Sequence, residues 1–456
     1  MIKYYKIKDL LKKNDIINFI NKIVGVKGWI LFFRNNLFLE INDGTTIDNL
    51  QIIVNQKFND LKKKFFPNLC LKIIGKVKYQ KKNKNNIEIK AKFIKIYNGY
   101  NKKFIIKSIL QNKYHRLSKI REQSYLRFRK KIFLTIFRIR HYLFLEIHNY
   151  LKKKDIIYIS TPLINNNNAE GAGETFQLKS NEQGKDIFNN KAYLTVSGQL
   201  ELESAMYGLS NVYSFGPVFR ADNSNTDKHL CEFWMLEIEI LFCKLKNIIK
   251  LSIKFIKYLL KKVLINCKKE LNNLMIYYNK YRNKNINLLD RLTVIIKNKF
   301  IIKTYNQIII LLKKYKNNII NWGDDIGSIH EKILFNNIFK KQIPIIIYNY
   351  PKKIKPFYMK ENKDKITTKS FDILFPFIGE IIGGSEREDN YQKLYNNIKE
   401  KKINLKNIKW YINLRKLGKL YHSGFGLGFE RLIQYITGIK NIRDVIPFPI
   451  YPGYTK

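Results

Sequence analysis

The sequence predicts an α+β protein in which an N-terminal OB-type β-barrel precedes a larger domain built on an antiparallel sheet flanked by helices. The chain has 456 residues, which is enough for two or three domains with a real core. Between residues 23 and 100, short alternating apolar runs are separated by turn signals, as is typical of a small barrel. Residues 213–240 read as a strand, a polar loop and a return strand, which predicts an antiparallel hairpin.

We expect five strands in the barrel, at residues 24–33, 37–42, 50–54, 71–79 and 87–96. Turn signals separate them, for example Asn35-Asn36 and Asp43-Gly44. OB-type barrels are a common platform for single-stranded nucleic acid, although the fold alone does not establish that role. The first domain is therefore predicted to cover residues 1–100.

The rest of the chain is predicted to form a hinge and one large domain. Residues 101–130 are basic and interrupted, as expected of a hinge. Apolar positions at helical spacing predict an amphipathic helix over 130–154, and a strand bearing Pro162 is expected over 156–164. The large domain would cover 131–456, with a helical insertion at about 243–342 that is rich in Lys, Ile and Asn and carries no chemical motif.

The composition is strongly basic. With 85 Lys and Arg against 36 Asp and Glu, the formal net charge is +49, which suits a polyanionic partner because such side chains release counterions from a phosphate backbone. The abundance of Lys, Ile, Asn, Tyr and Phe is also what an AT-rich coding sequence produces. Both readings of the charge therefore stay open.

Cysteine usage and hydropathy predict a cytoplasmic protein without a membrane segment. The four cysteines form no CxxC pair and do not cluster with the histidines, which argues against structural zinc and disulfides and for a reducing compartment. The N-terminal residues lack the apolar core of a signal peptide, and no apolar run approaches 18 residues.

The hairpin carries an unusual set of side chains. On its first strand Ser214, Gly216, Val218 and Arg220 share a face, which leaves space for a ligand that Arg220 can bind. On the return strand an aromatic ring and two carboxylates share a face, with residues Phe233, Met235, Glu237 and Glu239, while the alternate apolar residues form a core face. An ordinary solvated edge hairpin is the alternative reading.

The C-terminal part contains a glycine-rich strand, from Gly424 to Gly428, followed by a predicted helix over 430–437 with Gly438 as its C-cap. The glycines allow a ligand to approach the strand closely. Their spacing fits neither a Rossmann nor a P-loop fingerprint. No Ser/His/Asp or Cys/His constellation is evident, so covalent catalysis by a side chain is not expected.

Three segments resemble the motifs of the class II aminoacyl-tRNA synthetases. The string Phe-Gly-Pro-Val-Phe-Arg ending at Arg220, the loop with His229-Leu230 and the string Glu-Phe-Trp-Met-Leu-Glu ending at Glu237 resemble motif 2 of the aspartyl/asparaginyl/lysyl subgroup, and most of all its asparaginyl members. Residues 424–431 resemble motif 3. The long helix and the strand with Pro162 resemble motif 1, which builds the dimer interface in that family. The resemblance spans nearly the whole chain.

The resemblance implies a two-step, ATP-dependent reaction on tRNA-Asn. Asparagine and ATP would give asparaginyl-adenylate and pyrophosphate, and the tRNA terminal ribose would then take the acyl group. Cations and fixed donors aimed at the phosphates are what such a reaction needs. An aspartyl or non-discriminating enzyme is the alternative. Rivals of other classes are a tRNA-independent enzyme that makes asparagine from aspartate and an inactive binding module.

The same resemblance implies roles for individual residues at an ATP site. Arg220 would bind the α-phosphate and the substrate carboxylate, Phe233 would stack on adenine, and Arg431 would lie near the γ-phosphate. Magnesium would be held by Glu380, with Asp372 as the weaker candidate. The other residues implied at the ATP site are Asp222, His229, Leu230 and Gly428.

For the amino acid, the family would hold the ammonium with Glu170, Ser197 and Gln199, and the side-chain oxygen with Arg387. Thr195, Ser197 and Gln199 are expected to alternate onto one face of a strand. Two positions would distinguish an asparaginyl from an aspartyl enzyme. Leu202 stands where aspartyl enzymes have a lysine, and Glu237 can accept from an amide but would repel a carboxylate.

For the anticodon, the family would stack a base on Phe38 and read its edge with Gln51. The loop at 34–36 is shorter than usual in the family, which bears on contacts to the anticodon phosphates. Asp222, Lys228 and Ile450 depart from the usual Glu, Arg and Arg. The expected partners are tRNA-Asn, ATP, asparagine and a second copy of the chain.

Overall fold

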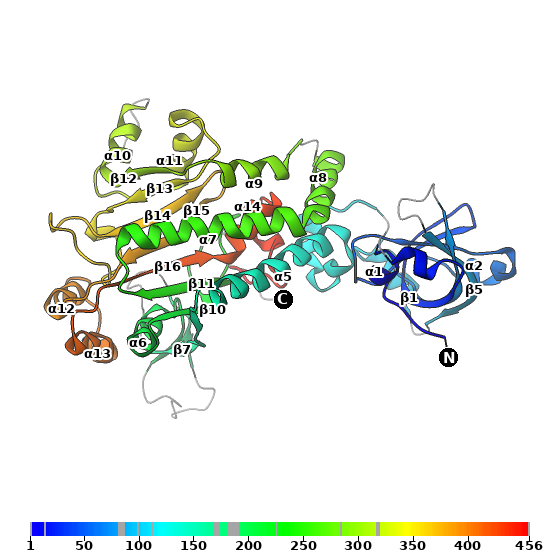
Figure 1. Cartoon of the computed structure of the whole chain (residues 1–456), viewed down its shortest axis with the longest axis horizontal. Helices are drawn as coiled ribbons and strands as arrows, with labels where there is room; N and C mark the ends of the chain where they lie inside the picture. Colours follow the sequence, from blue (N-terminus) through cyan, green and yellow to red (C-terminus); the bar gives the residue numbers. More distant parts are fainter. Residues whose placement is uncertain are drawn as a thin grey trace. The chain divides into compact units, whose positions relative to one another are not determined.

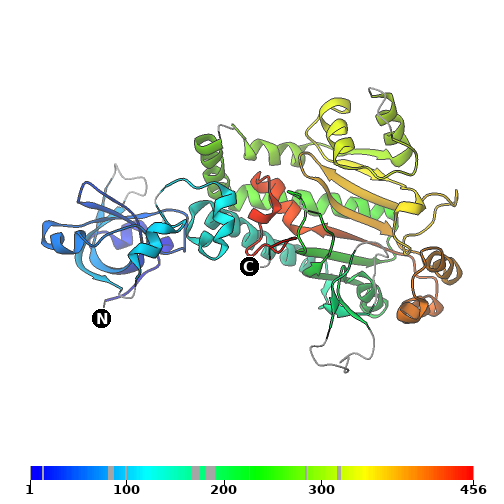
Figure 2. The ribbon, with the colours of Figure 1, turned by 180° about the vertical axis from the view of Figure 1, so that it is seen from behind.

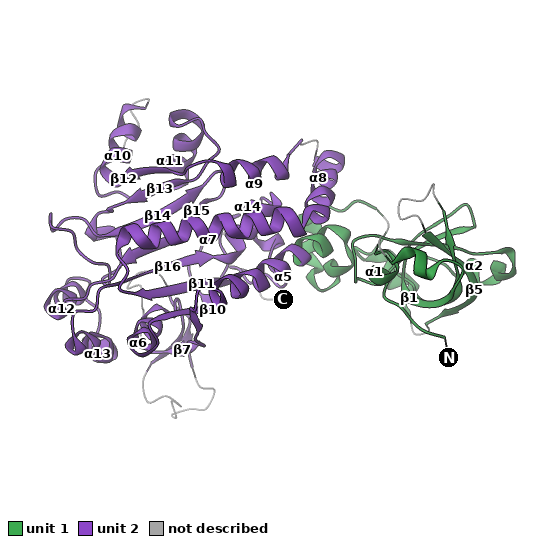
Figure 3. Cartoon of the chain, in the orientation of Figure 1, with its two compact units in different colours: residues 1–137 green, residues 138–456 purple. Residues whose placement is uncertain are grey.

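The computed structural model describes residues 2–12, 15–80, 87–97, 100–111, 113–166, 174–179, 191–224, 226–282, 285–315 and 320–454. The chain divides into two compact units, residues 1–137 and 138–456 (Figure 3). We describe each unit separately.

Unit 1 is a closed five-stranded barrel in the order β1-β2-β3-β5-β4 among the described residues. The strands are β1 (Ile23–Arg34), β2 (Phe38–Asn42), β3 (Leu50–Ile53), β4 (Cys70–Tyr79) and β5 (Ile87–Ile96). Among the described strands of this barrel, only the β3–β5 pair is parallel. Alternate residues such as Val26, Leu39 and Ile73 point inward and are fully buried. The predicted OB-type barrel is confirmed.

Short helices follow the barrel. They are α3 (Lys102–Lys107), α4 (Leu117–Glu122) and a 3₁₀ turn at Ser124–Arg129, after which α5 (Lys131–Lys152) begins. The amphipathic helix predicted over 130–154 is therefore present, and Ile136, Leu143 and Ile147 on its apolar face are fully buried.

Unit 2 is organised around a sheet of eight described strands in the order β12-β13-β14-β15-β16-β11-β10-β6 (Figure 1). In that order the strands are Ile301–Thr304, Ile345–Tyr348, Ser370–Phe375, Gly379–Glu386, His422–Gly428, Glu232–Leu241, Asn211–Phe219 and Ile157–Tyr158. The outermost pairs, β12 with β13 and β6 with β10, are parallel, and the pairs between them are antiparallel. This arrangement is the α+β architecture expected from the sequence.

Helices cover one face of this sheet. α7 (Leu245–Asn266) and α14 (Phe429–Thr437) pack on β15 and β16, and Figure 2 shows the strands of the sheet in front of α7. Phe425 of β16 points toward this layer, since its ring lies 6.3 Å from that of Phe255 in α7. Because side chains alternate along a strand, Gly424, Gly426 and Gly428 face the other side of the sheet. That side carries the site described below.

The remaining described helices surround the sheet. α8 (Lys268–Arg282), α9 (Leu288–Lys297), α10 (Tyr305–Lys314) and α11 (Ser328–Ile333) follow α7 in the chain, and α12 (Tyr391–Glu400) and α13 (Leu405–Asn413) follow β15. α6 (Gln199–Leu209) precedes the hairpin β10–β11. β12 lies within the segment predicted as a helical insertion, and the sequence analysis did not anticipate this strand.

The strand predicted over 156–164 is wrong in its extent. β6 covers only Ile157–Tyr158, and β7 (Ile164–Asn165) belongs to a separate three-stranded sheet with β9 (Ala192–Leu194) and β8 (Gln177–Leu178). Pro162 lies between the two strands, and because it has no N–H to donate it does not continue a ladder. The chain changes from one sheet to the other around it.

The helix predicted over 430–437 is confirmed as α14, Phe429–Thr437. Gly438 ends it with φ 72° and donates its N–H to the Gln434 carbonyl. Glycine adopts this left-handed conformation without a Cβ clash, as predicted for a C-cap.

Candidate active site

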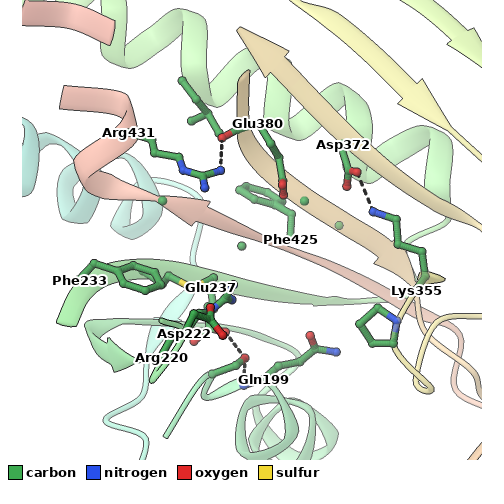
Figure 4. A pocket seen from close by; sticks show the side chains of 18 of the residues that line it. Gln199, Arg220, Asp222, Phe233, Glu237, Lys355, Asp372, Glu380, Phe425 and Arg431 are labelled. Atoms are coloured by element: carbon green, nitrogen blue, oxygen red, sulfur yellow. Dashed lines mark hydrogen bonds and ion pairs between the residues drawn. The ribbon is translucent and has the colours of Figure 1, made fainter. Parts of the chain in front are cut away.

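A cavity of about 640 Å³ lies in unit 2 on the glycine face of the sheet (Figure 4). Every site residue predicted for the large domain lines it, except Glu170, which lies outside the described residues. These residues are Ser197, Gln199, Arg220, Asp222, His229, Leu230, Phe233, Glu237, Asp372, Glu380, Arg387, Gly428 and Arg431. Residues separated by more than 200 positions in the sequence thus converge on one space.

The floor of the cavity follows from strand register. Glu237 of β11 pairs with Gly426 of β16, Gly426 with Gly383 of β15, and Gly383 with Asp372 of β14. Residues paired across adjacent strands point to the same face. Two glycines therefore separate two acidic side chains, and a ligand can lie directly on the backbone between them.

One end of the cavity is cationic and aromatic. Arg220 follows β10, and its guanidinium carbon lies 5.5 Å from the centre of the Phe233 ring on the neighbouring strand. Arg431, in the first turn of α14, donates from Nη1 to the Glu380 backbone carbonyl at 2.8 Å. Both side chains are held at the wall of a cavity that is open to solutes, as an anion site requires.

The loop between β10 and β11 adds a histidine to this end. His229 Nδ1 lies 2.5 Å from Thr226 Oγ1 and 3.1 Å from Ser224 Oγ. Burial and the nearby Arg431 lower the pKa of His229, so its imidazole is neutral at neutral pH. Lys228 contacts Glu331 of α11 at 3.4 Å.

The two carboxylates predicted to bind metal approach each other across Gly383. A Cβ added at Gly383 would lie 2.8 Å from Glu380 Oε1 and 3.4 Å from Asp372 Oδ1, so the absence of a side chain at Gly383 leaves room for both carboxylates on this face. Lys355 Nζ contacts Asp372 Oδ2 at 2.6 Å. Burial raises the pKa of Asp372 to about 6, although Lys355 acts to lower it. The sequence analysis missed Lys355.

The other end of the cavity contains a buried arginine. Arg387 donates to both oxygens of Glu239, from Nε at 3.2 and 3.1 Å, and to Ser385 Oγ from Nη1 at 2.7 Å. Burial raises the pKa of Glu239, against the opposing effect of Arg387. The close contact of the guanidinium with both carboxylate oxygens makes the pair a buried salt bridge. The sequence analysis assigned Glu239 no role, and the structure shows that it is the counter-charge of Arg387.

Glu237 is held by the turn that precedes α6. Ser197 Oγ donates to Glu237 Oε1, and the Gly198 N–H donates to Oε2 at 2.9 Å. Ser214 Oγ of β10 also reaches Oε2, at 3.4 Å. Glu237 is therefore a buried carboxylate with its hydrogen-bond donors in place, as a buried charge requires.

One expectation about this end was wrong. Thr195, Ser197 and Gln199 do not alternate along a strand, because β9 ends at Leu194 and the Thr195 hydroxyl donates to the Ser197 carbonyl within a turn. Gln199 is the first residue of α6. Leu202 does not line the cavity, since it is fully buried in a core cluster with Met206 and Val212.

In unit 1 the two residues predicted to bind an anticodon share the outer face of the barrel. Phe38 and Gln51 are both half-buried. Across the β2–β3 ladder, Phe38 pairs with Ile53 and Gln51 pairs with Glu40. Gln51 Nε2 donates to Glu88 Oε2 at 2.9 Å, which fixes the orientation of its amide. The short loop before β2 is a tight turn in which Asn35 and Asn36 both have positive φ.

The comparisons with known proteins agree with this geometry. Residues 117–451 match the family model described as tRNA synthetases class II (D, K and N), and residues 24–97 match the OB-fold nucleic acid binding domain. The fold and the site thus define a class II tRNA synthetase of the D, K and N group.

Individual relatives identify the family within this group. The chain is 41% identical to the asparagine–tRNA ligase of Azobacteroides pseudotrichonymphae, covering 99% of this chain and 98% of the relative, and 40% identical to that of Borreliella burgdorferi, covering 98% and 99%. Among solved structures, the asparaginyl-tRNA synthetase of Pyrococcus horikoshii complexed with asparaginyl-adenylate is 29% identical over the whole of both chains, with a TM-score of 0.86. Within the D, K and N group, the chain belongs to the asparagine–tRNA ligase family.

Two further observations bear on the predicted surroundings of the protein. No helix in the described ranges is long and apolar enough to cross a membrane. Cys70, Cys231, Cys243 and Cys267 all lie within those ranges, and none of them is in a disulfide.

Proposed function

We propose that this protein attaches asparagine to tRNA-Asn in two steps. The asparagine carboxylate attacks the α-phosphorus of ATP, which forms asparaginyl-adenylate and releases pyrophosphate. A terminal ribose hydroxyl of the tRNA then takes the acyl group, and AMP leaves. The observation that carries this proposal is that one cavity combines a cationic, aromatic end with a buried, charge-balanced end, joined by a floor of glycines.

At the cationic end, Arg220, Arg431 and Phe233 form the ATP subsite. The first step brings a carboxylate close to a triphosphate, and these two anions repel each other. Fixed positive charge therefore lowers the barrier of this step. Arg220 is placed to bind the α-phosphate and the attacking carboxylate together, because a planar guanidinium can serve two oxygens. The adenine ring stacks on Phe233, and Asp222, His229, Leu230 and Gly428 surround the nucleotide.

Magnesium fits the pair of carboxylates beside this subsite. Glu380 and Asp372 offer hard oxygen donors on one face, with Gly383 leaving the space between them. When bound, the ion supplies positive charge to the β- and γ-phosphates. Glu380 is the principal ligand, because Lys355 already neutralises Asp372.

At the charge-balanced end, Ser197 and Gln199 hold the substrate ammonium, and Arg387 donates to the side-chain oxygen. Glu170, which the family resemblance also assigns to the ammonium, lies outside the described residues. The net charge at this end of the cavity selects the side-chain amide of asparagine over the side-chain carboxylate of aspartate. Glu239 balances Arg387, Glu237 adds one more negative charge, and residue 202 contributes no cation. A carboxylate side chain would enter a pocket of its own sign, whereas the amide NH₂ can donate to Glu237.

Two assays separate this proposal from its alternatives. Pyrophosphate exchange and acylation of total tRNA are each measured with asparagine and with aspartate. Exchange and acylation with asparagine alone would support the proposal. Equal or preferred use of aspartate would favour the aspartyl or non-discriminating alternative, and exchange without tRNA acylation would favour a tRNA-independent enzyme. Absence of exchange would indicate an inactive binding module.

The outer face of the barrel serves as the anticodon contact. Phe38 offers a ring for base stacking, and Gln51, oriented by Glu88, can read a base edge. The basic composition supports binding of the tRNA backbone. The buried and half-buried reduced thiols fit a cytoplasmic location.

A homodimer is proposed from the apolar edge of the large sheet. Ile157 and Tyr158 of β6 are 45% and 48% exposed, and Leu163, Ile164 and Leu145 of α5 are similarly exposed. Such an edge strand with apolar side chains favours pairing with another chain. Light scattering of the wild type and of Ile157→Lys tests this, since the substitution should convert the dimer to a monomer.

A further inference from the structure

Gln199 is oriented by a single described side-chain partner. Its Nε2 donates to Glu203 Oε1 at 3.0 Å, one turn further along α6. Gln199 is nearly buried, and it lines the cavity at the start of that helix (Figure 4). Which end of its amide faces the substrate therefore depends on what Glu203 can accept or donate.

Glu203 is a fully buried carboxylate with donors from three other elements. Tyr411 of α13 donates to its oxygens at 2.8 and 2.9 Å, Arg415 donates from Nη2 at 2.6 Å, and His422 Nε2 of β16 lies 2.9 Å from Oε2. Burial acts to raise the pKa of Glu203, but Arg415 and His422 outweigh it and lower the pKa below its usual range. The group is therefore an anion that can only accept hydrogen bonds.

This fixes the amide of Gln199 in one orientation. Because Glu203 only accepts, the NH₂ of Gln199 must face it, and the carbonyl oxygen is directed away from it. A carbonyl oxygen is what a substrate ammonium requires. In the flipped orientation the NH₂ would face the ammonium, and two donors would oppose each other.

The same cluster also supports the segment that carries Arg387. Arg415 donates from Nε to the backbone carbonyl of Glu388 at 3.0 Å, and Glu388 follows Arg387 in the chain. Glu203, Glu239 and His422 lie close enough together to hold a metal ion. In this structure Arg415 and Arg387 already supply the counter-charges of the two carboxylates.

We infer that Glu203 is a positioning residue for amino-acid binding, and that it acts through Gln199. The inference rests on the proposed function, in which Gln199 receives the asparagine ammonium. Glu203 itself does not line the cavity, but it determines which end of the Gln199 amide faces the substrate there.

A double-mutant cycle on the full-length protein tests this inference by pyrophosphate exchange. Glu203→Asp keeps the buried charge for Arg415 and His422 but withdraws the carboxylate by one methylene, and Gln199→Met removes the amide at similar volume. Each single variant should raise the KM for asparagine about tenfold, with kcat and the KM for ATP within threefold of wild type. The double variant should be no worse than Gln199→Met alone, since the two residues act as one unit.

The outcomes distinguish a failure of the inference about Glu203 from a failure of the proposed role of Gln199. An additive, about hundredfold rise in the double variant, or an unchanged asparagine KM in Glu203→Asp, would overturn the inference. If Gln199→Met alone leaves the asparagine KM unchanged, the proposed role of Gln199 fails instead.

Three further variants distinguish the inference from a merely structural role of Glu203. Tyr411→Phe removes another hydrogen bond to the same carboxylate, so it should lower Tm while the asparagine KM stays within twofold. If Glu203→Asp does not fold, Gln199→Glu is compared with the exchanged pair Gln199→Glu, Glu203→Gln. The exchanged pair restores one carboxylate facing one amide, and it should recover at least tenfold in KM over Gln199→Glu. No recovery would contradict the inference.

Discussion

Arg387 and Glu239 form a buried salt bridge at the charge-balanced end of the cavity, although they are 148 positions apart in the sequence. Their side chains are only 3% and 1% exposed. Both residues line the cavity, and the positive charge of Arg387 is balanced by the carboxylate of Glu239. This combination suits a neutral, polar side chain such as the amide of asparagine.

Replacing Glu239 should therefore weaken discrimination. In Glu239→Gln the positive charge of Arg387 is no longer balanced. The side-chain carboxylate of aspartate should therefore bind more tightly, whereas the side-chain amide of asparagine should not. We expect the ratio of kcat/KM for asparagine to that for aspartate in pyrophosphate exchange to fall at least tenfold. Glu388→Gln, a buried carboxylate that does not line the cavity, is the matched control and should leave the ratio unchanged.

Glu237→Gln tests the second negative charge of this end. The amide is isosteric, so folding should be retained, but the repulsion of an aspartate side chain is lost. The asparagine/aspartate ratio in the same assay should fall, and Tm should change by only a few degrees. An unchanged ratio would show that Glu237 serves only to hold the Ser197–Gly198 turn.

Gly424 should not tolerate a side chain. A Cβ there would lie within van der Waals overlap of the Glu239 carboxylate and 2.4 Å from the Ile238 carbonyl, so Gly424→Ala must displace the Arg387–Glu239 pair. We expect a loss of about 3 kcal/mol or more in the free energy of unfolding, measured with urea, together with loss of exchange activity. Gly216→Ala is the control, because a Cβ at Gly216 of β10 meets no described atom within 4 Å.

Glu201 should make stability depend on pH. Burial raises the pKa of Glu201 to about 7 in the folded protein. Between about pH 4.5 and 7, the folded protein therefore keeps a proton on Glu201 that the unfolded chain has already released. Stability from this group is therefore present at low pH and is lost as pH rises toward 7. Glu201→Gln should raise the free energy of unfolding by about 1–2 kcal/mol at pH 8 and by much less at pH 5.

Urea denaturation at the two pH values checks this prediction. Glu122→Gln, in an exposed ion pair with Lys119, should change stability by less than about 0.5 kcal/mol at either pH. An equal gain from Glu201→Gln at pH 5 and pH 8 would contradict the assignment.

Phe38→Ala should separate tRNA binding from adenylate formation. Stacking of one base contributes about 1–3 kcal/mol, so the KM for tRNA in aminoacylation should rise about tenfold or more. Pyrophosphate exchange without tRNA should stay unchanged, because the exchange site lies in unit 2. Tyr79→Ala removes an exposed aromatic elsewhere on the same barrel and should leave the KM for tRNA near its wild-type value.

The sequence predicted best those features that are local. The barrel strands, the hairpin β10–β11, α5 and α14 each show their own periodicity or cap, so the pattern within one short window was sufficient. Strand alternation on β11 also placed Phe233 and Glu237 on the cavity side.

Features that depend on distant partners could not be predicted in this way. Glu239 and Glu237 look alike on the strand, and only Arg387 gives Glu239 its role. Glu203 meets Tyr411, Arg415 and His422, which follow it by 208, 212 and 219 positions. β12 becomes a strand because β13 offers a parallel edge 44 residues later, and the turn at Thr195 replaces a strand because its hydroxyl bonds to the local backbone.

The order of strands in space differs from their order of synthesis. β16, the last described strand in the sequence, is the one that joins β15 to β11 at the centre of the sheet. Until it emerges from the ribosome, the nascent chain holds two half-sheets whose inner edges expose unpaired backbone groups. A protein cut short before His422 would therefore lose its continuous sheet and become prone to aggregation, whereas the barrel of unit 1 closes on strands made long before. β16 is thus the strand on which the continuity of this sheet depends.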